Sequence, residues 1–192
     1  MRILLHLCCA PCSTFCLESL RQEGHDLLGF FYNPNIHPFR EYLLRQEAMQ
    51  RYSREAALPV LWMPEEGMES FFRQVAFHEP DRCRICYRMR LFRAAEMASQ
   101  RGYPAFTTTL LISPYQKHDL LREVGFEAAE RTGVLFYYKD LRSGWRWSRQ
   151  RAKELNLYRQ TYCGCLYSEK ERLLERRERK AWPLESTPLE KS

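Results

Sequence analysis

Short apolar runs alternate along the chain with longer stretches in which apolar positions recur at helical spacing. The runs are typical of buried strands because they are too short for buried helices. We predict five strands, over residues 2–7, 27–32, 58–63, 105–110 and 134–138. The stretches between them predict helices over residues 13–22, 41–57, 68–77, 83–102 and 113–132. Two further helical stretches surround Cys163 and Cys165.

Strands that alternate with helices in this way predict a doubly wound α/β fold with a parallel sheet. We expect a single α/β domain over residues 1–182 that includes a helical C-terminal extension, followed by a flexible tail over residues 183–192. Sheets of this kind bind ligands beyond the carboxyl ends of their strands. Four segments that follow strands should therefore converge at one edge. They are Cys8 with Cys9, and residues 32–35, 107–113 and 140–142.

The composition limits the class of protein. The chain has 192 residues, of which 45% are hydrophobic and 28% charged, and this excludes a disordered, collagen-like or coiled-coil protein. No apolar run approaches the roughly 18–20 residues that span a bilayer. The apolar stretch at residues 3–7 is too short for a signal peptide and runs directly into cysteines. We therefore expect a cytoplasmic protein with no membrane partner.

Positive charge is concentrated near the C-terminus. The net charge is +6, and residues 139–180 hold thirteen Lys or Arg against six Asp or Glu. Such a segment is typical of proteins that bind a polyanion. A solvated helix surface with spare arginines would give the same charge, so both interpretations stay open.

The eight cysteines fall into three clusters. These are Cys8, Cys9, Cys12 and Cys16; then Cys83 and Cys86; then Cys163 and Cys165. Clustering of this kind in a cytosolic protein indicates metal or redox chemistry, because disulfide frameworks are rare in that compartment. One member, Cys16, falls at an apolar helical position and is interpreted as a core thiol.

Two of the clusters can supply metal ligands. Cys83 and Cys86 form a C-x-x-C chelate, which alone fits zinc, a dithiol or no function. With Cys8 and Cys9 they provide four thiolates, which suit a tetrahedral zinc or a [4Fe–4S] cluster. Adjacent cysteines are awkward for zinc, whose ligands usually lie about two to four residues apart, so the spacing favours the cluster. Cys12 lies close enough in sequence to bind an additional metal.

The third cluster differs, because a single glycine separates Cys163 from Cys165. Such a pair can close into a strained disulfide with a more oxidising potential, which favours electron delivery. Two further metal ligands or two buried thiols are the alternatives, and both stay open. No phosphate-binding loop follows the first strand, since residues 8–12 occupy the place where its glycines would lie.

Histidines and tyrosines are weaker candidates for functional residues. We interpret His6, on the first strand, as a core residue with its hydrogen bonds satisfied. His37 and His118 fall near the predicted site and are candidate proton donors. Four tyrosines could stack on a nucleic-acid base, although tyrosine is also ordinary core and surface material. They are Tyr32, Tyr115, Tyr158 and Tyr162.

Five motifs occur in order between residues 3 and 170. They read HLCCAP at residues 6–11, YNPNI at 32–36, DRCRIC at 81–86, TTTL at 107–110 with SPY at 113–115, and YRQTYCGC at 158–165. This ordered set resembles the QueH-type epoxyqueuosine reductases. The resemblance implies a fold like that of the adenine-nucleotide α-hydrolases (HUP fold), without their phosphate loop.

The resemblance also implies a reaction. An epoxyqueuosine reductase converts the epoxide at the wobble position of a tRNA to an alkene, in the last step of queuosine synthesis. The implied partners are a tRNA with a GUN anticodon that carries epoxyqueuosine and an unidentified electron donor. The implied cofactor, which works without cobalamin, is a [4Fe–4S] cluster held by Cys8, Cys9, Cys83 and Cys86.

Two further roles follow from the resemblance. Cys163 and Cys165 would be the catalytic pair and would form a redox-active disulfide. Some family members have aspartate where this chain has Cys12, and an accessory iron is associated with that neighbourhood. Cys12 is therefore a candidate ligand for an additional iron ion, or a residue that alters how the cluster is held.

Two other functions fit the same residues. A zinc-binding protein that modifies or binds RNA without redox chemistry would use the metal-ligand cysteines and the basic segment. A thiol oxidoreductase that acts on proteins would use Cys163 and Cys165. It would leave Cys8, Cys9 and the basic segment unexplained.

Overall fold

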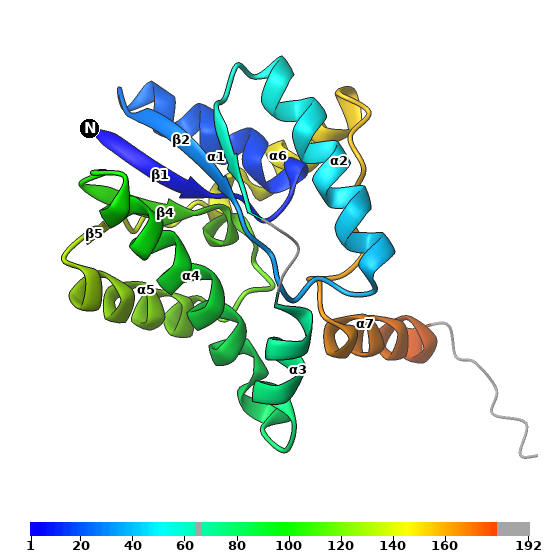
Figure 1. Ribbon diagram of the computed structural model, residues 1–192. Helices are drawn as coiled ribbons and strands as arrows, with labels where there is room; N and C mark the ends of the chain where they lie inside the picture. The colour runs from blue at the N-terminus through cyan, green and yellow to red at the C-terminus, as the bar shows by residue number, and fades with distance from the viewer. Residues whose placement is uncertain (64–66, 180–192) are drawn as a thin grey trace, which may run out of the picture.

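Five parallel strands form one sheet in the order β3-β2-β1-β4-β5 in the computed structural model, which describes residues 1–63 and 67–179 (Figure 1). The strands are β1 (Arg2–His6), β2 (Asp26–Phe31), β3 (Val60–Trp62), β4 (Ala105–Thr108) and β5 (Leu135–Phe136). The predicted α/β class and parallel sheet are confirmed. Because β1 is the central strand, its carboxyl end lies in the middle of the edge at which such sheets bind ligands.

Helices cover both faces of the sheet. They are α1 (Ala10–Gln22), α2 (Phe39–Glu55), α3 (Met68–Val75), α4 (Arg82–Gln100), α5 (His118–Thr132), α6 (Trp145–Glu154) and α7 (Leu166–Arg179). Alternate residues of β1 explain the two layers, because successive strand side chains point to opposite faces. Leu4 packs with α4 and α5, whereas Ile3 and Leu5 pack with α1, α2 and α6 (Figure 1).

Helix α7 is the predicted C-terminal extension. None of its residues is buried, and it projects from the body of the molecule (orange in Figure 1). It is tied to α4 through Arg82, which pairs with Glu171 and lies over the ring of Tyr167. The predicted tail over residues 183–192 lies outside the described residues, and the domain boundary at residue 182 stays a prediction. No helix in the described part of the chain is long and apolar enough to cross a membrane.

The first helix begins earlier than the sequence pattern predicted. It starts at Ala10 rather than near Ser13, with Cys9 as the N-cap residue. Pro11 explains the start, because a proline at the first turn of a helix loses no hydrogen bond. The Ser13 hydroxyl donates to the carbonyl oxygen of Cys9 at 2.8 Å instead of capping the helix.

The helix predicted from residue 113 begins later, at His118. A 3₁₀ turn over Thr109–Ile112 follows β4 directly. Ser113 then has an extended backbone, as expected of a residue that precedes proline. The loop that results places residues 115–117 at the same edge of the sheet as the end of β1.

Candidate active site

Three thiols meet at the carboxyl end of β1. The Sγ atoms of Cys8, Cys9 and Cys12, here called the thiol trio, lie within 4.8 Å of one another, and all three side chains are buried. The Sγ atoms of Cys8 and Cys9 are 3.7 Å apart. Cys9 has an extended backbone where the chain passes from β1 into α1, and Cys12 lies in the first turn of that helix. The strand-to-helix junction therefore assembles the trio.

Two polar side chains from distant segments contact the trio. The Thr109 hydroxyl accepts a hydrogen bond from the Cys8 amide at 2.9 Å and donates to the Cys8 sulfur at 3.1 Å. The Gln160 side-chain amide donates to the Cys9 sulfur at 2.9 Å. The thiol trio is thus reached from β1, from the end of β4 and from the segment between α6 and α7.

The three thiols of the trio differ in acidity. The pKa of Cys9 lies well below its usual value: burial opposes this shift, but hydrogen bonds from Cys12 and Cys8 stabilise the thiolate and outweigh it. The pKa of Cys8 is raised to about 11, because the contact with Cys9 and burial together outweigh the hydrogen bond from Cys12. Hydrogen bonds with Cys8 and Cys9, together with burial, raise the pKa of Cys12. The arrangement therefore favours the thiolate form of Cys9 over that of Cys8 or Cys12.

Cys83 and Cys86 lie in the first turns of α4 and are partly buried. Burial raises the pKa of Cys86 to about 12, against the opposing charge of Arg90. Neither sulfur joins the thiol trio, which is the one closely spaced group of metal-ligating atoms in the described residues. The structure therefore brings Cys12 into contact with Cys8 and Cys9, whereas the predicted set that includes Cys83 and Cys86 stays a prediction.

The predicted redox pair lies between α6 and α7, in residues 158–165, here called the dithiol segment. Cys163 is exposed, Cys165 is partly buried, and both are free thiols. Gln116 donates from its side-chain amide to the Cys163 sulfur at 3.2 Å. Burial is the main cause that raises the pKa values of Cys83 and Cys86, and the sulfurs of Cys163 and Cys165 add to it, so these four sulfurs lie within electrostatic reach of one another.

A buried arginine anchors the dithiol segment to α2. The Arg45 side chain is 2% exposed and pairs with Glu41 at 2.7 Å. Its two terminal nitrogens donate to the carbonyl oxygens of Cys163 at 2.8 Å and Tyr162 at 3.1 Å. The planar guanidinium can make all of these bonds at once, which a lysine could not do.

The loop after β2 holds the same segment from another side. The amide of His37 donates to the carbonyl oxygen of Gly164 at 2.7 Å, and the Tyr162 hydroxyl donates to the carbonyl oxygen of His37. Gly164 has a φ of +159°, and an added Cβ would lie 3.3 Å from Ile36 Cγ1. The tight contact with the Ile36 side chain, together with the positive φ, therefore favours glycine between the two cysteines.

Arg90 is a second buried cation, and it has no carboxylate partner among the described residues. It lies on α4, is 2% exposed, and donates from Nε to the side-chain oxygen of Asn35 at 2.7 Å. Its charge opposes the rise that burial causes in the pKa of Cys86 and adds to the fall that burial causes in the pKa of His37. Because a buried charge without a counter-ion is costly, the surrounding pocket favours an anionic group, and the thiols are the groups within reach.

Burial disfavours the charged forms of the histidines near the site. The ring nitrogens of His6 contact the Thr108 hydroxyl at 2.8 Å and the carbonyl oxygen of Tyr32 at 3.0 Å, so its predicted core role is confirmed. Burial and Arg90 lower the pKa of His37 to about 4. Burial also lowers the pKa of His118. Both shifts disfavour the imidazolium form of these rings, and the predicted role of His37 and His118 as proton donors stays a prediction.

Sequence reasoning missed Arg45 and Arg90 as parts of the site. Each lies on the apolar stripe of its helix, at helical spacing from buried aromatic residues: Arg45 follows Tyr42, and Arg90 follows Tyr87. A charged residue on a buried stripe was the available signal, because such residues are almost never buried without a specific partner. Thr109 and Gln160 carried no comparable signal, although both fall within or beside the quoted motifs.

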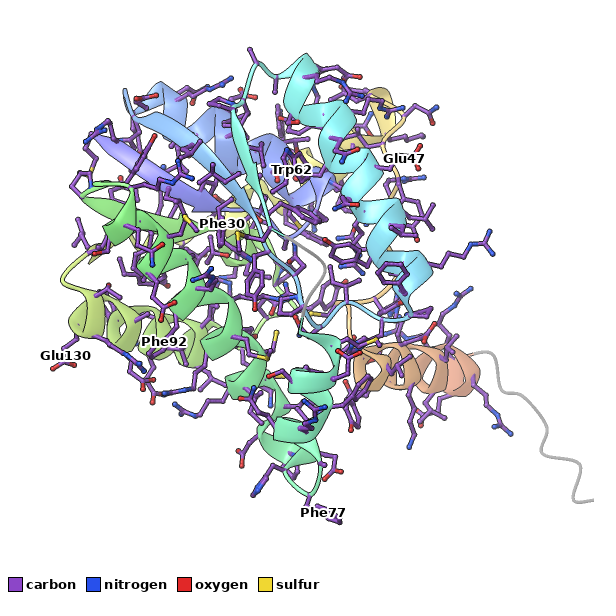
Figure 2. All side chains as sticks on the ribbon, viewed as in Figure 1. Phe30, Glu47, Trp62, Phe77, Phe92 and Glu130 are labelled. Carbon is purple, nitrogen blue, oxygen red and sulfur yellow. The ribbon has the colours of Figure 1, made fainter. Side chains whose placement is uncertain are left out.

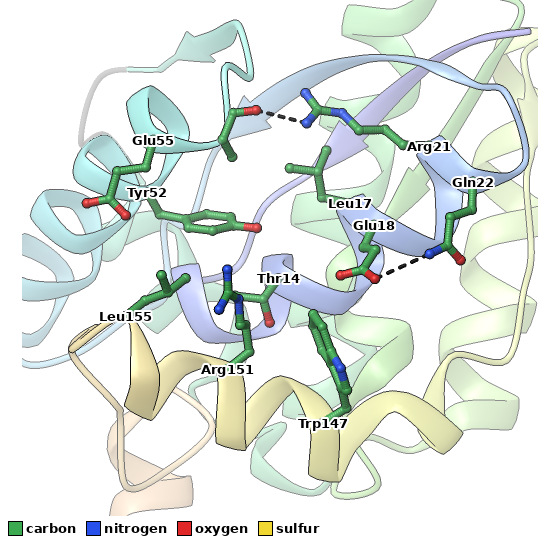
Figure 3. Close-up of a pocket in the computed structure, with 11 residues that line it drawn as sticks. Thr14, Leu17, Glu18, Arg21, Gln22, Tyr52, Glu55, Trp147, Arg151 and Leu155 are labelled. Carbon is green, nitrogen blue, oxygen red and sulfur yellow. Dashed lines mark hydrogen bonds between the residues drawn. The ribbon is translucent and has the colours of Figure 1, made fainter.

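A separate cavity of about 500 Å³ lies between α1, α2 and α6 (Figure 3). No cysteine lines it. Its four charged side chains, Glu18, Arg21, Glu55 and Arg151, balance in sign. Arg21 is already engaged, because it donates to the carbonyl oxygens of Ala56 and Ala57 at the end of α2. This cavity is therefore separate from the candidate active site at the cysteines.

Comparison with known proteins decides the family. The family model for Epoxyqueuosine reductase QueH matches residues 3–171, a range that contains all eight cysteines. The chain belongs to the QueH family. A curated relative from Dehalococcoides mccartyi, named Epoxyqueuosine reductase QueH, is 43% identical over 171 residues, which cover 89% of this chain and 94% of the relative. The resemblance of the five motifs is thereby confirmed.

A further QueH relative supports the family, and a solved structure supports the fold. The Thermotoga maritima relative of the same name is 36% identical over 188 residues, which cover 93% of this chain and 94% of the relative. A crystal structure described as a predicted subunit of a tRNA methyltransferase, from Methanocaldococcus jannaschii, aligns with a TM-score of 0.52. It is 14% identical and covers 80% of this chain and 75% of that chain, so it supports the fold alone.

Proposed function

We propose that this QueH family member is an epoxyqueuosine reductase that acts on tRNA. It would reduce the epoxide of epoxyqueuosine at the wobble position to the alkene of queuosine, as the last step of queuosine synthesis. Family membership over residues 3–171 supports the reaction. The observation that carries the chemistry is the buried thiol trio, together with a buried Arg90 whose charge acts on Cys86 and that has no carboxylate partner in the described residues.

The donor set fits an iron–sulfur cofactor that works without cobalamin. Thiolates are the ligands that iron–sulfur clusters use, and a thiolate-bound cluster is anionic, so it would offset the charge of Arg90. When bound, such a cluster supplies single electrons and an iron that acts as a Lewis acid. Cys12 would bind an additional iron or change how the cluster is held. The residues proposed to hold the [4Fe–4S] cluster are Cys8, Cys9, Cys83 and Cys86.

The dithiol segment supplies an electron pair in this proposal. Reduction of the epoxide consumes an electron pair and two protons, forms the alkene and releases the oxygen as water. Oxidation of Cys163 and Cys165 to a disulfide releases an electron pair and two protons, so one dithiol balances one turnover. A separate donor of electrons must then reduce the disulfide. The exposure of Cys163 supports access by both the substrate and that donor.

The RNA partner would be a tRNA with a GUN anticodon. Its wobble base must leave the anticodon loop to reach sulfurs at the edge of the sheet. The basic residues of α6 and α7 would contact phosphates. This proposal requires the cytoplasm, where tRNA is matured.

A zinc-binding protein that modifies or binds RNA is the second candidate, and one distance favours it. Zinc–sulfur bonds of about 2.3 Å in a tetrahedral site place two sulfurs about 3.8 Å apart. The 3.7 Å between the Cys8 and Cys9 sulfurs fits such a single ion. A single iron held by the trio would give the same spacing, so the metal itself must be identified.

Anaerobic purification of the whole chain, followed by iron, zinc and sulfide analysis, tests the proposal. We expect a brown protein that contains iron and inorganic sulfide in similar amounts and absorbs near about 400 nm. A colourless protein that contains zinc and no sulfide would overturn the redox function in favour of the second candidate. Turnover of epoxyqueuosine in tRNA, with a chemical reductant, completes the test.

A further inference from the structure

The structure separates the four tyrosines that the sequence offered for base stacking. Tyr32 stacks on a neighbouring phenylalanine, and the hydroxyls of Tyr158 and Tyr162 are hydrogen-bonded to other parts of the site. The ring of Tyr115 is 74% exposed. An exposed ring is the one available to a ligand, so Tyr115 is the candidate that the structure selects.

Tyr115 is part of a larger aromatic and basic surface. Its ring meets the edge of Trp145, with centroids 5.8 Å apart and planes at 81°. The guanidinium of Arg149 lies 5.7 Å from the centre of the Trp145 ring. Tyr115, Trp145 and Arg149 are here called the Tyr115 platform. Neither Arg149 nor its exposed neighbour Arg146 pairs with a carboxylate within residues 1–63 and 67–179.

The platform lies beside the proposed redox pair. The residue after Tyr115, Gln116, donates to the Cys163 sulfur at 3.2 Å. The charge of Lys117 acts on Cys83. A flat group stacked on Tyr115 would therefore lie close to Cys163 and Cys83.

We propose that the Tyr115 platform stacks an unpaired base of the RNA loop next to the base that is reduced. This inference rests on the proposed function and names the surface that orients its substrate. Single-stranded RNA is bound by aromatic rings that stack on bases, together with arginines that contact phosphates. Two arginines without carboxylate partners beside an exposed ring match that chemistry. An acidic protein partner would need the charges but not the open face of the ring.

Binding of a short RNA hairpin to the whole chain tests the inference. The probe carries a GUN anticodon in its loop, with unmodified guanine at the wobble position, and is followed by fluorescence anisotropy. Tyr115→Ala should weaken binding about tenfold, because loss of one stacked base has an effect of this order. Tyr115→Phe keeps the ring and should bind within about twofold of the unmodified chain. The salt dependence of binding should not change in either variant, since neither removes a phosphate contact.

Phe77→Ala is the matched control. Phe77 is 95% exposed and points away from the body beyond α3, so its removal also deletes an exposed ring (Figure 2). We expect unchanged binding. Arg149→Gln should lower the salt slope by about one, as loss of one phosphate contact does.

Three outcomes would overturn the inference. Unchanged affinity in Tyr115→Ala would remove the stacking role. An equal loss of affinity for a fully paired RNA duplex would show that the ring does not recognise an unpaired base. If the unmodified chain does not bind the hairpin at all, the tRNA substrate of the proposed function falls too, and this result is distinct from the other two.

Discussion

The thiol trio is held by the core, whereas the dithiol segment is held by hydrogen bonds from its neighbours. Cys8, Cys9 and Cys12 are buried and follow directly from the strand-to-helix junction at β1. Cys163 is exposed, in a segment without regular secondary structure. A metal site benefits from sulfurs that are fixed in advance, while a pair that cycles between dithiol and disulfide needs room to move. The contrast agrees with different roles for the two groups.

Replacement of Cys8 or Cys9 by alanine should have the largest effect. Each variant should lose most of its iron, because the site loses one of the thiolates proposed to hold it. The same loss is expected for Cys83→Ala and Cys86→Ala. Iron and sulfide analysis after anaerobic purification gives the measurement.

Cys16→Ala is the control for these variants. Cys16 is buried in α1, the helix that also holds Cys12, but it lies outside the thiol trio. The iron content of this variant should therefore stay normal. Normal iron in any one of the four ligand variants would remove that residue from the proposed set.

Cys163→Ser and Cys165→Ser should separate the two groups. We expect both variants to keep their iron and their RNA binding, and to lose nearly all turnover, because the electron pair of the dithiol is missing. Iron content and turnover are measured on the same preparation. Loss of iron in parallel with activity would make these cysteines ligands, and full activity would make them bystanders.

Arg45→Met should loosen the dithiol segment, while the three sulfurs of the trio stay held by β1 and α1. The substitution leaves Glu41 buried without its cationic partner. Breaking a buried ion pair in this way typically costs about 3–5 kcal/mol in the free energy of unfolding. We expect a lower urea midpoint, faster alkylation of Cys163 and unchanged iron content. The measurements are urea unfolding and the rate of maleimide labelling.

Arg40→Met, on the exposed side of the same helix, is the control and should alter none of these quantities. An Arg45→Met variant whose labelling rate equals that of Arg40→Met would show that Arg45 does not anchor the segment.

Low pH should also loosen the dithiol segment, by a smaller amount than the Arg45→Met substitution. The pKa of His37 is about 4 in the folded protein, below the usual 6.5, because burial and Arg90 disfavour its charged form. The unfolded chain therefore binds the proton more readily between these values, and stability falls as the pH drops from 6.5 towards 4. The slope from this group is at most about 1.4 kcal/mol per pH unit.

His37→Phe keeps the aromatic packing on Phe72 and removes the titration, so its unfolding free energy should depend less on pH in that range. Urea unfolding at several pH values, with Cys163 labelling beside it, makes the measurement. An identical pH profile in both chains would contradict the role of His37.

The sequence predicted the sheet, the alternating helices and the position of Cys8 and Cys9 after the first strand, because these follow from the hydrophobic period. It did not predict that Cys12 would contact Cys8 and Cys9. That contact depends on the backbone at Cys9 and on a helix start set by Pro11, which the apolar pattern does not encode. The carbonyl oxygens that Arg45 holds and the Asn35 side chain that Arg90 contacts lie on other segments, so the period of their own helices could not name them.

The dithiol segment is held through its main chain. Three successive carbonyl oxygens, those of Tyr162, Cys163 and Gly164, accept hydrogen bonds from Arg45 and His37. Bonds of this kind do not depend on which side chain the residue carries. Position 163 can therefore accept selenocysteine or a cysteine bearing a redox dye while the backbone keeps its place. In an engineered version, the side chain at position 163 is exchanged while the main chain of the dithiol segment keeps its hydrogen bonds.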